Sequence, residues 1–200
     1  STVKTEYLIE DKKFPEYDHR WGLQWQYIGI FQENWKFETD YSKVSDLRYF
    51  TDVDSNIGKQ EDGQLIQEFR ASYRTHNWDL SLLSRDFQVL TEGNQPYRLL
   101  PQLSFNYYSP EIMKSLDFDV VSHISHFDTD ANGKPSATRL HIEPGLTVPI
   151  GNTWGNWTTE VRLLSTYYKQ DLKGIDTTTP NQPSYGLEEE VSRTIPEFRS

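Results

Sequence analysis

Apolar and polar residues alternate with a period of two along most of the chain. Between Trp21 and Tyr27 the odd positions are apolar and the even positions are polar or glycine, and the alternation returns between Trp35 and Tyr41 after a short connection. Successive side chains on a β-strand point to opposite faces, so this pattern predicts a hairpin with one apolar and one charged face. Ten segments of the chain are strand-like, at residues 2–9, 21–30, 35–42, 65–74, 78–89, 98–108, 116–127, 138–149, 157–168 and 187–199.

The connections between these segments alternate between long and short. Most segments have 8–13 residues, close to the roughly 9–11 that a tilted strand needs to cross a bilayer. Short turns on one side and long loops on the other are typical of an outer-membrane barrel, with the long loops outside the cell. We therefore predict an all-β fold, an antiparallel up-and-down transmembrane β-barrel segment with both chain ends on the periplasmic side. The long connections are residues 10–20, 43–64, 90–97, 128–137 and 169–186, and the short ones are 31–34, 75–77, 109–115 and 150–156.

The two parities of the strands predict two sets of residues with different surroundings. In a barrel that holds water, the charged set faces the lumen and the apolar set faces lipid. The candidate lumen-facing residues are Lys36, Glu38, Glu68, Arg70, Arg85, Arg98, Asp117, Asp119, Arg139, His141, Glu143, Glu160 and Arg162. The candidate lipid-facing residues are Trp21, Leu23, Trp25, Trp35, Phe37, Phe69, Trp78, Leu80, Leu103, Phe105, Phe118, Val120, Leu140, Ile142, Leu146, Trp157, Val161 and Leu163.

Composition agrees with strands that are half polar. Apolar residues make up 35% of the chain and mean hydropathy is −0.75, and no run approaches the roughly 18 apolar residues of a membrane-spanning helix. Aromatic residues reach 14%, and Trp21, Trp35, Trp78 and Trp157 stand at or near the starts of strand-like segments. This placement predicts aromatic girdles at the membrane–water interfaces.

Charge and terminal sequence narrow the possible functions. The net charge is −10 and no basic stripe is present, which argues against nucleic-acid binding. The 43–64 loop carries Asp46, Asp52, Asp54, Glu61 and Asp62 against three basic residues, so part of the acidic excess is expected on the outer surface. The chain has no cysteine and no apolar leader segment, and it begins and ends in strand-like sequence, which predicts a piece of a larger barrel.

Candidate metal and catalytic patterns are weak. The sequence from Asp128 to Gly133 resembles the start of a calcium loop, but Arg139 occupies the position of the essential glutamate. His123, His141 and Glu143 share the predicted lumen side, where hydrated side chains are the simpler interpretation. With no phosphate loop and no nucleophile elbow, we predict no catalytic residue, no cofactor and no metal site. Several prolines lie inside the strand segments, Pro101 among them, and are expected at bulges or strand ends.

Several stretches, in order along nearly the whole chain, resemble the LptD family of lipopolysaccharide-assembly proteins. Each stretch is short, and the resemblance rests on their order. The stretches are Tyr41–Asp52, Phe87–Val89, Pro101–Leu103, Arg139–Pro144 with Pro149, Leu163–Tyr168 and Arg193–Phe198.

The resemblance implies a fold and a set of partners. The family forms an outer-membrane barrel of about 26 strands, preceded by a periplasmic jellyroll. It receives lipopolysaccharide from a periplasmic LptA-type bridge and releases it between its first and last strands, while an LptE-type lipoprotein fills the lumen. Residues 1–200 would then be an interior part of that barrel in a Gram-negative outer membrane, in contact with membrane lipids, with the jellyroll and the first and last strands outside this chain.

Two other functions share the same alternation. A porin-like diffusion channel has the same composition and differs in conducting ions. A soluble β-sandwich, such as a carbohydrate-binding module, would cover the apolar face with a second sheet. In the sandwich, aromatic residues would be spread evenly along the strands and would not gather near strand ends.

Overall fold

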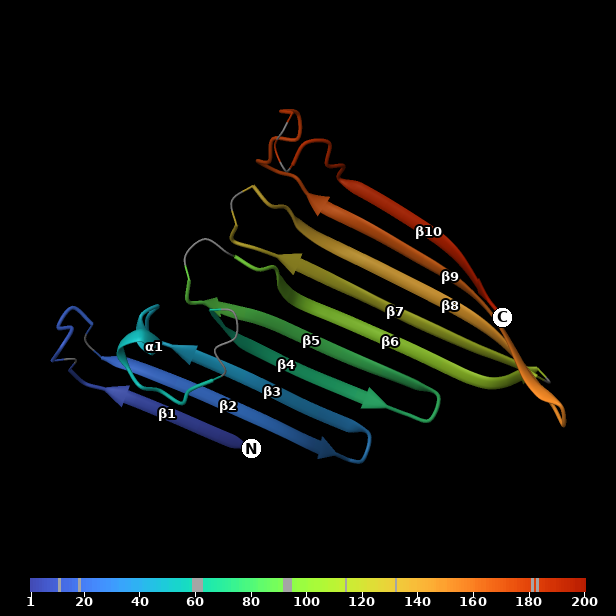
Figure 1. Ribbon diagram of the computed structural model, residues 1–200, viewed down its shortest axis with the longest axis horizontal. Coiled ribbons are helices and arrows are strands. Elements are labelled where there is room, and N and C mark those ends of the chain that lie inside the picture. The colour runs from blue at the N-terminus through green and yellow to red at the C-terminus, as the bar shows by residue number, and fades with distance from the viewer. Residues whose placement is uncertain are drawn as a thin grey trace.

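The strands form one antiparallel sheet in chain order (Figure 1). The computed structural model describes residues 1–200 except 11, 18, 59–62, 92–94, 114, 132, 181 and 183. The predicted all-β, up-and-down architecture is confirmed, with β1 and β10 at the two edges of an open sheet. The strands are β1 (Thr2–Leu8), β2 (Arg20–Phe31), β3 (Trp35–Val44), β4 (Gln64–Arg74), β5 (Trp78–Val89), β6 (Arg98–Met113), β7 (Leu116–Asp128), β8 (Ser136–Asn152), β9 (Gly155–Asp171) and β10 (Glu190–Arg199).

Each observed strand coincides with a predicted segment, and the largest differences lie at two short connections. The predicted connections 109–115 and 150–156 are mostly strand, because β6 continues to Met113 and β8 to Asn152. Gly151 pairs with Asn156 in the β8–β9 ladder, whereas Pro110 lies in β6 where the register with β7 is interrupted between Ser109 and Met113. The β8–β9 hairpin therefore consists of two 17-residue strands joined by a tight turn.

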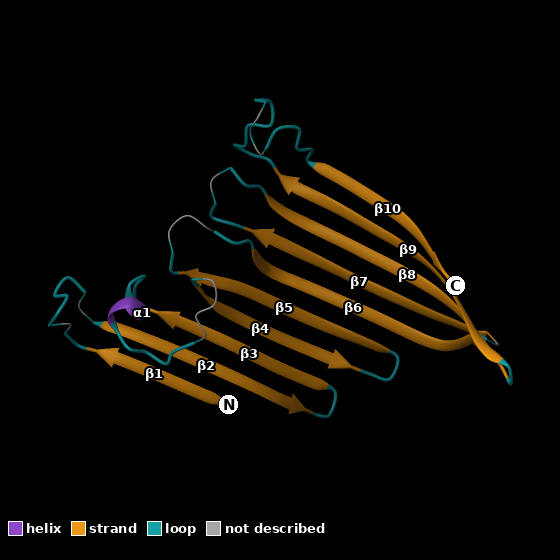
Figure 2. Cartoon of the chain, viewed as in Figure 1, coloured by secondary structure: helices purple, strands orange, loops and turns teal. Residues whose placement is uncertain are grey.

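The connections sort to two sides of the sheet. The long loops and the short helix α1 (Tyr49–Asp52) lie together along one end of the strands, and the short turns lie along the other (Figure 2). Both chain termini lie on the side of the short turns (Figure 1). No helix among the described residues is long and apolar enough to cross a membrane.

Local backbone chemistry explains the tightness of the short turns. At the β2–β3 turn, Gln32 and Glu33 both have positive φ, 50° and 62°. Two consecutive left-handed residues give the turn the twist that matches a right-handed β-hairpin. At the β4–β5 turn, the Thr75 hydroxyl accepts a hydrogen bond from the Trp78 backbone N–H at 3.1 Å and donates to its carbonyl at 3.0 Å, which closes a loop of two residues.

A β-bulge in β6 changes which face its first residues occupy. The register of β6 shifts by one residue between Leu99 and Gln102, and Pro101 lies inside this shift. Proline has no N–H to donate to the ladder, so a bulge accommodates it, as expected from the sequence. Because of the extra residue, Leu99 shares a face with Arg85, and Arg98 lies on the opposite face.

Apart from Leu83 in the middle of β5, the buried apolar side chains of the described residues form one cluster at the long-loop end. It consists of five side chains: Val44, Tyr49, Ile57, Leu65 and Leu90. Three of these come from strand ends or the adjoining loops, and two come from the connection between β3 and β4, which includes α1. The α1 helix was not predicted, because four residues are too few to show a helical period.

Candidate functional site

The pairing register assigns every strand residue to one of two faces. Directly opposed residues of antiparallel strands project to the same side, so the row Glu38, Arg70, Leu83, Gln102, Ser125 and Arg139 defines one face. We call this the polar face, and we call the other, which carries Phe37, Leu103 and Leu140, the aromatic face. All candidate lipid-facing residues lie on the aromatic face. All candidate lumen-facing residues except Arg98 lie on the polar face.

Arg98 does not join the other candidate lumen-facing residues. The bulge at Pro101 places it on the aromatic face at the long-loop end, opposite Asp128. Its guanidinium contacts Asp128 at 2.6 Å and Asp130 at 2.9 Å. The simple alternation therefore assigned Arg98 to the wrong face, since one extra residue reverses the parity of everything before it.

A belt of rings runs across the aromatic face close to the short turns. Ring centroids are 4.9 Å apart for Trp35 and Tyr73, 5.3 Å for Tyr73 and Trp78, and 6.2 Å for Trp78 and Phe105. Trp35 also stacks on Phe37 at 5.9 Å. Two of the four tryptophans expected in girdles, Trp35 and Trp78, thus lie in this belt, which spans four adjacent strands. Trp21 lies at the long-loop end of β2, and Trp157 lies on β9, away from the belt.

The aromatic face presents large apolar side chains to its surroundings. Trp25 is 44% exposed, Leu103 is 42% exposed and Val161 is 49% exposed, although all three lie inside strands of a wide sheet. Exposed apolar surface of this extent marks contact with a partner or with lipid.

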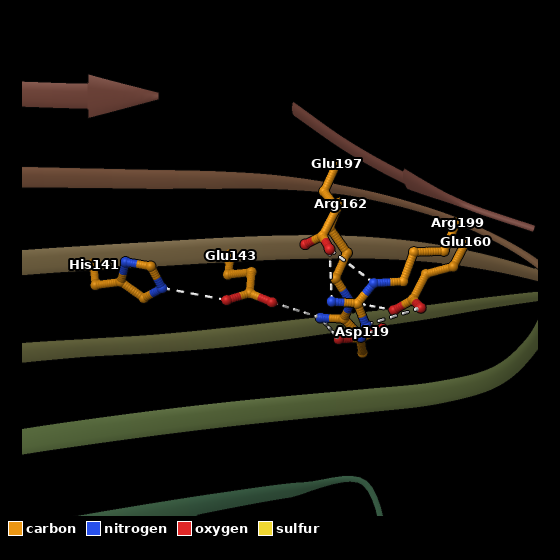
Figure 3. Close-up of polar contacts among 7 residues, drawn as sticks. All are labelled: Asp119, His141, Glu143, Glu160, Arg162, Glu197 and Arg199. Atoms are coloured by element: carbon orange, nitrogen blue, oxygen red, sulfur yellow. Dashed lines mark hydrogen bonds and ion pairs between the residues drawn. The ribbon is translucent and has the colours of Figure 1, made fainter. Parts of the chain in front are cut away.

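Arg162 connects three strands of the polar face (Figure 3). Its Nη1 lies 2.9 Å from Asp119 Oδ2 on β7 and 3.1 Å from Glu143 Oε1 on β8, and its Nε contacts Glu160 on β9 itself. Arg199 on β10 adds an ion pair to Glu197 at 2.6 Å. These side chains form one continuous ladder of opposite charges along the polar face, which the sequence had predicted only as separate lumen-facing residues.

A glycine makes room for this ladder. Gly145 lies directly between Asp119 and Arg162 in the register, so Arg162 reaches across β8 to Asp119 over a position without a side chain. A Cβ at Gly145 would lie 2.7 Å from Asp119 Oδ1 and 3.1 Å from Arg162 Cζ. Glycine inside a strand often marks such a close approach, and Gly145 is the sequence signal that could have revealed this contact.

His141 extends the ladder toward the long loops. Its Nε2 lies 3.3 Å from Glu143 Oε2, and its Nδ1 shares a hydrogen bond of 2.7 Å with Thr166 Oγ1. The His123 ring stacks on His141 at 5.0 Å. Within the described residues, no group of three or more metal-ligating side chains is arranged to hold a metal ion.

A second, smaller cluster of charges lies on β4 and β5. The Glu68 carboxylate contacts Arg70 at 3.3 Å and Arg85 at 2.6 Å, and on β3 Lys36 pairs with Glu38 at 2.8 Å. These pairs leave little net charge in this part of the polar face. Direct contacts between candidate lumen-facing residues therefore neutralise most of their charge here.

The connection between β3 and β4 folds back over the polar face. We call its residues 45–58 the loop cap. The Glu6 carboxylate accepts hydrogen bonds from the Tyr49 hydroxyl at 3.0 Å, the Ser55 hydroxyl at 2.6 Å and the Asn56 backbone N–H at 3.3 Å. Glu6 pairs with Gly22 on the polar face, and a Cβ at Gly22 would lie 3.0 Å from Ile57. The loop cap therefore packs against strands β1 and β2 on that side.

The acidic residues of the loop cap are partly neutralised by the sheet. Arg20 is 1% exposed and contacts Asp46 at 2.8 Å and Asp52 at 3.2 Å. Two of the carboxylates expected at the outer surface are therefore bound to a buried guanidinium. Glu61 and Asp62 of the same prediction lie outside the described residues. Burial, together with the hydrogen bond to Glu6, raises the pKa of Tyr49 to about 12.

Comparison with known sequences identifies the family. A sequence model described as "LptD: LPS transport system D" matches residues 18–200. The chain belongs to the LptD family. This confirms the family that the ordered stretches of sequence had indicated.

Relatives from several bacteria share most of this chain. The LPS-assembly protein LptD of Vibrio cholerae is 61% identical over 99% of the chain, and that of Aliivibrio fischeri is 51% identical over 99%. The LPS-assembly protein LptD of Yersinia enterocolitica is 38% identical over 90% of it. The chain spans about a quarter of the length of these LptD relatives.

Proposed function

We propose that this segment forms part of the wall of an outer-membrane barrel, in a protein that assembles lipopolysaccharide at the cell surface. The aromatic face contacts lipid, the polar face lines the lumen, and the long loops lie outside the cell. The segment performs no catalysis in this proposal. Its contribution is to maintain a continuous hydrogen-bonded wall between the bilayer and a hydrated interior.

The separation of the two faces carries the proposal. A single layer of ten strands has exposed apolar residues on one side and paired charges on the other. In water such a face is unfavourable by about 25 cal/mol per Å² of apolar surface, whereas in a bilayer it is surrounded by acyl chains. The aromatic belt near the short turns then lies at the periplasmic interface, where tryptophan and tyrosine are favoured.

The loop cap favours assembly over free diffusion through a channel. It covers part of the polar face at the end where an open pore would meet the outside, and it is attached through Glu6, Arg20 and Ile57. A diffusion channel keeps this entrance open to solutes. A lumen whose outer end is partly covered instead suits a protein that releases its cargo through the wall.

The family suggests the partners of the whole protein. We infer that an LptE-type lipoprotein occupies the lumen against the polar face, and that lipopolysaccharide arrives from an LptA-type periplasmic bridge. Membrane lipids contact the aromatic face. The charge ladder on Arg162, with acidic and basic groups within reach of one another, provides a polar surface for a folded plug or for a hydrated sugar chain.

A matched pair of arginine substitutions tests the location of the two faces. Leu103 lies on the aromatic face of β6, and Ser104 follows it on the polar face. In the full-length protein, Leu103→Arg should lower the yield of assembled barrel strongly, because an arginine at the bilayer midplane costs about 2–4 kcal/mol. Ser104→Arg should assemble normally, because its side chain enters water.

The readouts are the folded fraction on unheated gels and the lipopolysaccharide accessible at the surface of cells that depend on the variant. We expect Leu103→Arg to lower both and Ser104→Arg to lower neither. Equal assembly of the two variants would contradict a lipid-facing aromatic face. A separate measurement tests the export function. If cells are depleted of the wild-type barrel and their surface lipopolysaccharide does not change, the export function is contradicted.

A further inference from the structure

Arg139 is an arginine on the polar face without a carboxylate partner among the described residues. Arg70, Arg85 and Arg162 on the same face each contact at least one carboxylate. The Nε of Arg139 is buried and makes no hydrogen bond to any described residue. Its guanidinium lies over the ring of Tyr168, 5.6 Å from the centroid, which orients it without neutralising its charge.

The register explains why no carboxylate reaches Arg139. Its direct cross-strand neighbours are Ser125 on β7 and Tyr168 on β9. None of the residues around it on the polar face is acidic. Along β8 and at the diagonal positions of β7 and β9 these are Ala137, His141, Phe127, His123, Gln170 and Thr166.

The nearest acid on β8, Glu143, is already engaged. It contacts Arg162 at 3.1 Å and His141 at 3.3 Å. Arg139 therefore keeps a full positive charge in a half-buried position, where an unpaired charge is costly until an anion binds.

His123 supplies a second donor beside Arg139. It lies diagonally across from Arg139, and diagonal neighbours on one face of a sheet are separated by about 7–8 Å. Its ring stacks on His141, but neither of its nitrogens makes a hydrogen bond to a described residue. An arginine fork and an imidazole at this separation can converge on one tetrahedral oxyanion, and the planar fork suits phosphate oxygens in particular.

We propose that Arg139 and His123 form a binding site for a phosphate group on the polar face, carried by a phosphorylated sugar headgroup. The phosphate site follows from the unpaired donors alone. The identity of its carrier rests on the proposed function, since a lumen that faces lipopolysaccharide meets sugar phosphates. Tyr168 and Thr166 adjoin the site and offer a ring and a hydroxyl to the sugar.

The test uses the full-length protein in detergent at low ionic strength, titrated with glucosamine 1-phosphate or with inorganic phosphate and followed by ³¹P NMR. Arg139→Gln should weaken binding at least tenfold, equivalent to about 1.4 kcal/mol. The control is Lys169→Gln, which removes the same charge one residue beyond Tyr168, on the aromatic face. Arg139→Lys keeps the charge without the fork and should weaken binding by roughly threefold.

Weaker binding by Arg139→Gln with unchanged binding by Lys169→Gln supports the site. Tighter binding of glucosamine 1-phosphate than of inorganic phosphate identifies the sugar phosphate as the carrier, and equal binding overturns that identification. Unchanged binding by Arg139→Gln, or an equal loss in Lys169→Gln, overturns the site. If Arg139→Gln gives no folded band on unheated gels, the phosphate binding of Arg139→Lys is compared with that of Lys169→Gln instead. These binding measurements do not bear on whether the wild-type protein delivers lipopolysaccharide to the cell surface. The export function is therefore tested separately, by depletion of the wild-type barrel.

Discussion

Arg162 offers the sharpest test of how the polar face holds its strands together. Replacement by glutamine leaves Asp119, Glu143 and Glu160 near one another without their shared cation. Removing one partner of a fully buried ion pair costs about 3–5 kcal/mol, and removing an exposed pair costs about 0.2–1 kcal/mol. The side chains here are 17–22% exposed. We therefore expect Arg162→Gln to lower the free energy of unfolding by about 2–3 kcal/mol.

Arg199 provides the matched control. It lies in the same ladder and carries the same charge, but its side chain is 64% exposed and its contact with Glu160 is 3.9 Å long. Arg199→Gln should therefore cost less than about 1 kcal/mol. The double variant Arg162→Gln with Glu143→Gln should recover part of the loss, because it removes one of the stranded carboxylates.

The assay is urea unfolding of the full-length protein in lipid vesicles, followed by loss of the fast-migrating folded band on unheated gels. The midpoint should fall clearly for Arg162→Gln, slightly for Arg199→Gln, and by an intermediate amount for the double variant. Equal midpoints for the two single variants would refute the reasoning, because burial of the Arg162 contacts would then have no energetic consequence.

Three further predictions concern the loops and the glycine under the ladder. Ile57→Ala, at a side chain 1% exposed, should cost the loop cap about 2–5 kcal/mol and expose residues 45–58 to protease while the folded gel band persists; protection equal to wild type would contradict the packing. Gly145→Val should separate Asp119 from Arg162 and lower the urea midpoint as much as Arg162→Gln, whereas an unchanged midpoint would show that the strands adjust. Hydrogen bonds from Thr179 and Thr178 lower the pKa of Asp176 from 3.8 to about 2, so the 172–189 loop should keep its turn above pH 3.8 and lose it as pH falls through about 2; an NMR titration midpoint near 4 would count against these bonds.

The division of the sheet into two faces could be read from the chain alone. Side-chain direction in a strand repeats every two residues, so the alternation from Trp21 to Tyr27 or from Trp35 to Tyr41 already states which residues share a side. The strand pairs joined by the short connections followed as well, because such connections allow only antiparallel neighbours. Both properties depend on a few consecutive residues, and local sequence is sufficient for them.

Three features depended on contacts between distant residues. The bulge at Pro101 moved Arg98 to the aromatic face, because a single inserted residue reverses parity and alternation cannot locate the insertion. The loop cap lies against the polar face because Glu6, on the first strand, is within hydrogen-bond distance of Tyr49 and Ser55, and because Arg20 contacts Asp46 and Asp52. The charge ladder required Gly145 to stand between Asp119 and Arg162.

The lack of a carboxylate partner for Arg139 also depends on contacts between residues that are distant in the sequence. The sequence shows an arginine that alternates with apolar residues, as Arg70 and Arg162 do. Whether a carboxylate reaches such an arginine depends on the residues brought beside it from β7 and β9, and these are selected by the register of three strands. The chain thus specifies through its local alternation which residues face each side, whereas long-range pairing decides which charges on one side meet and which remain unpaired.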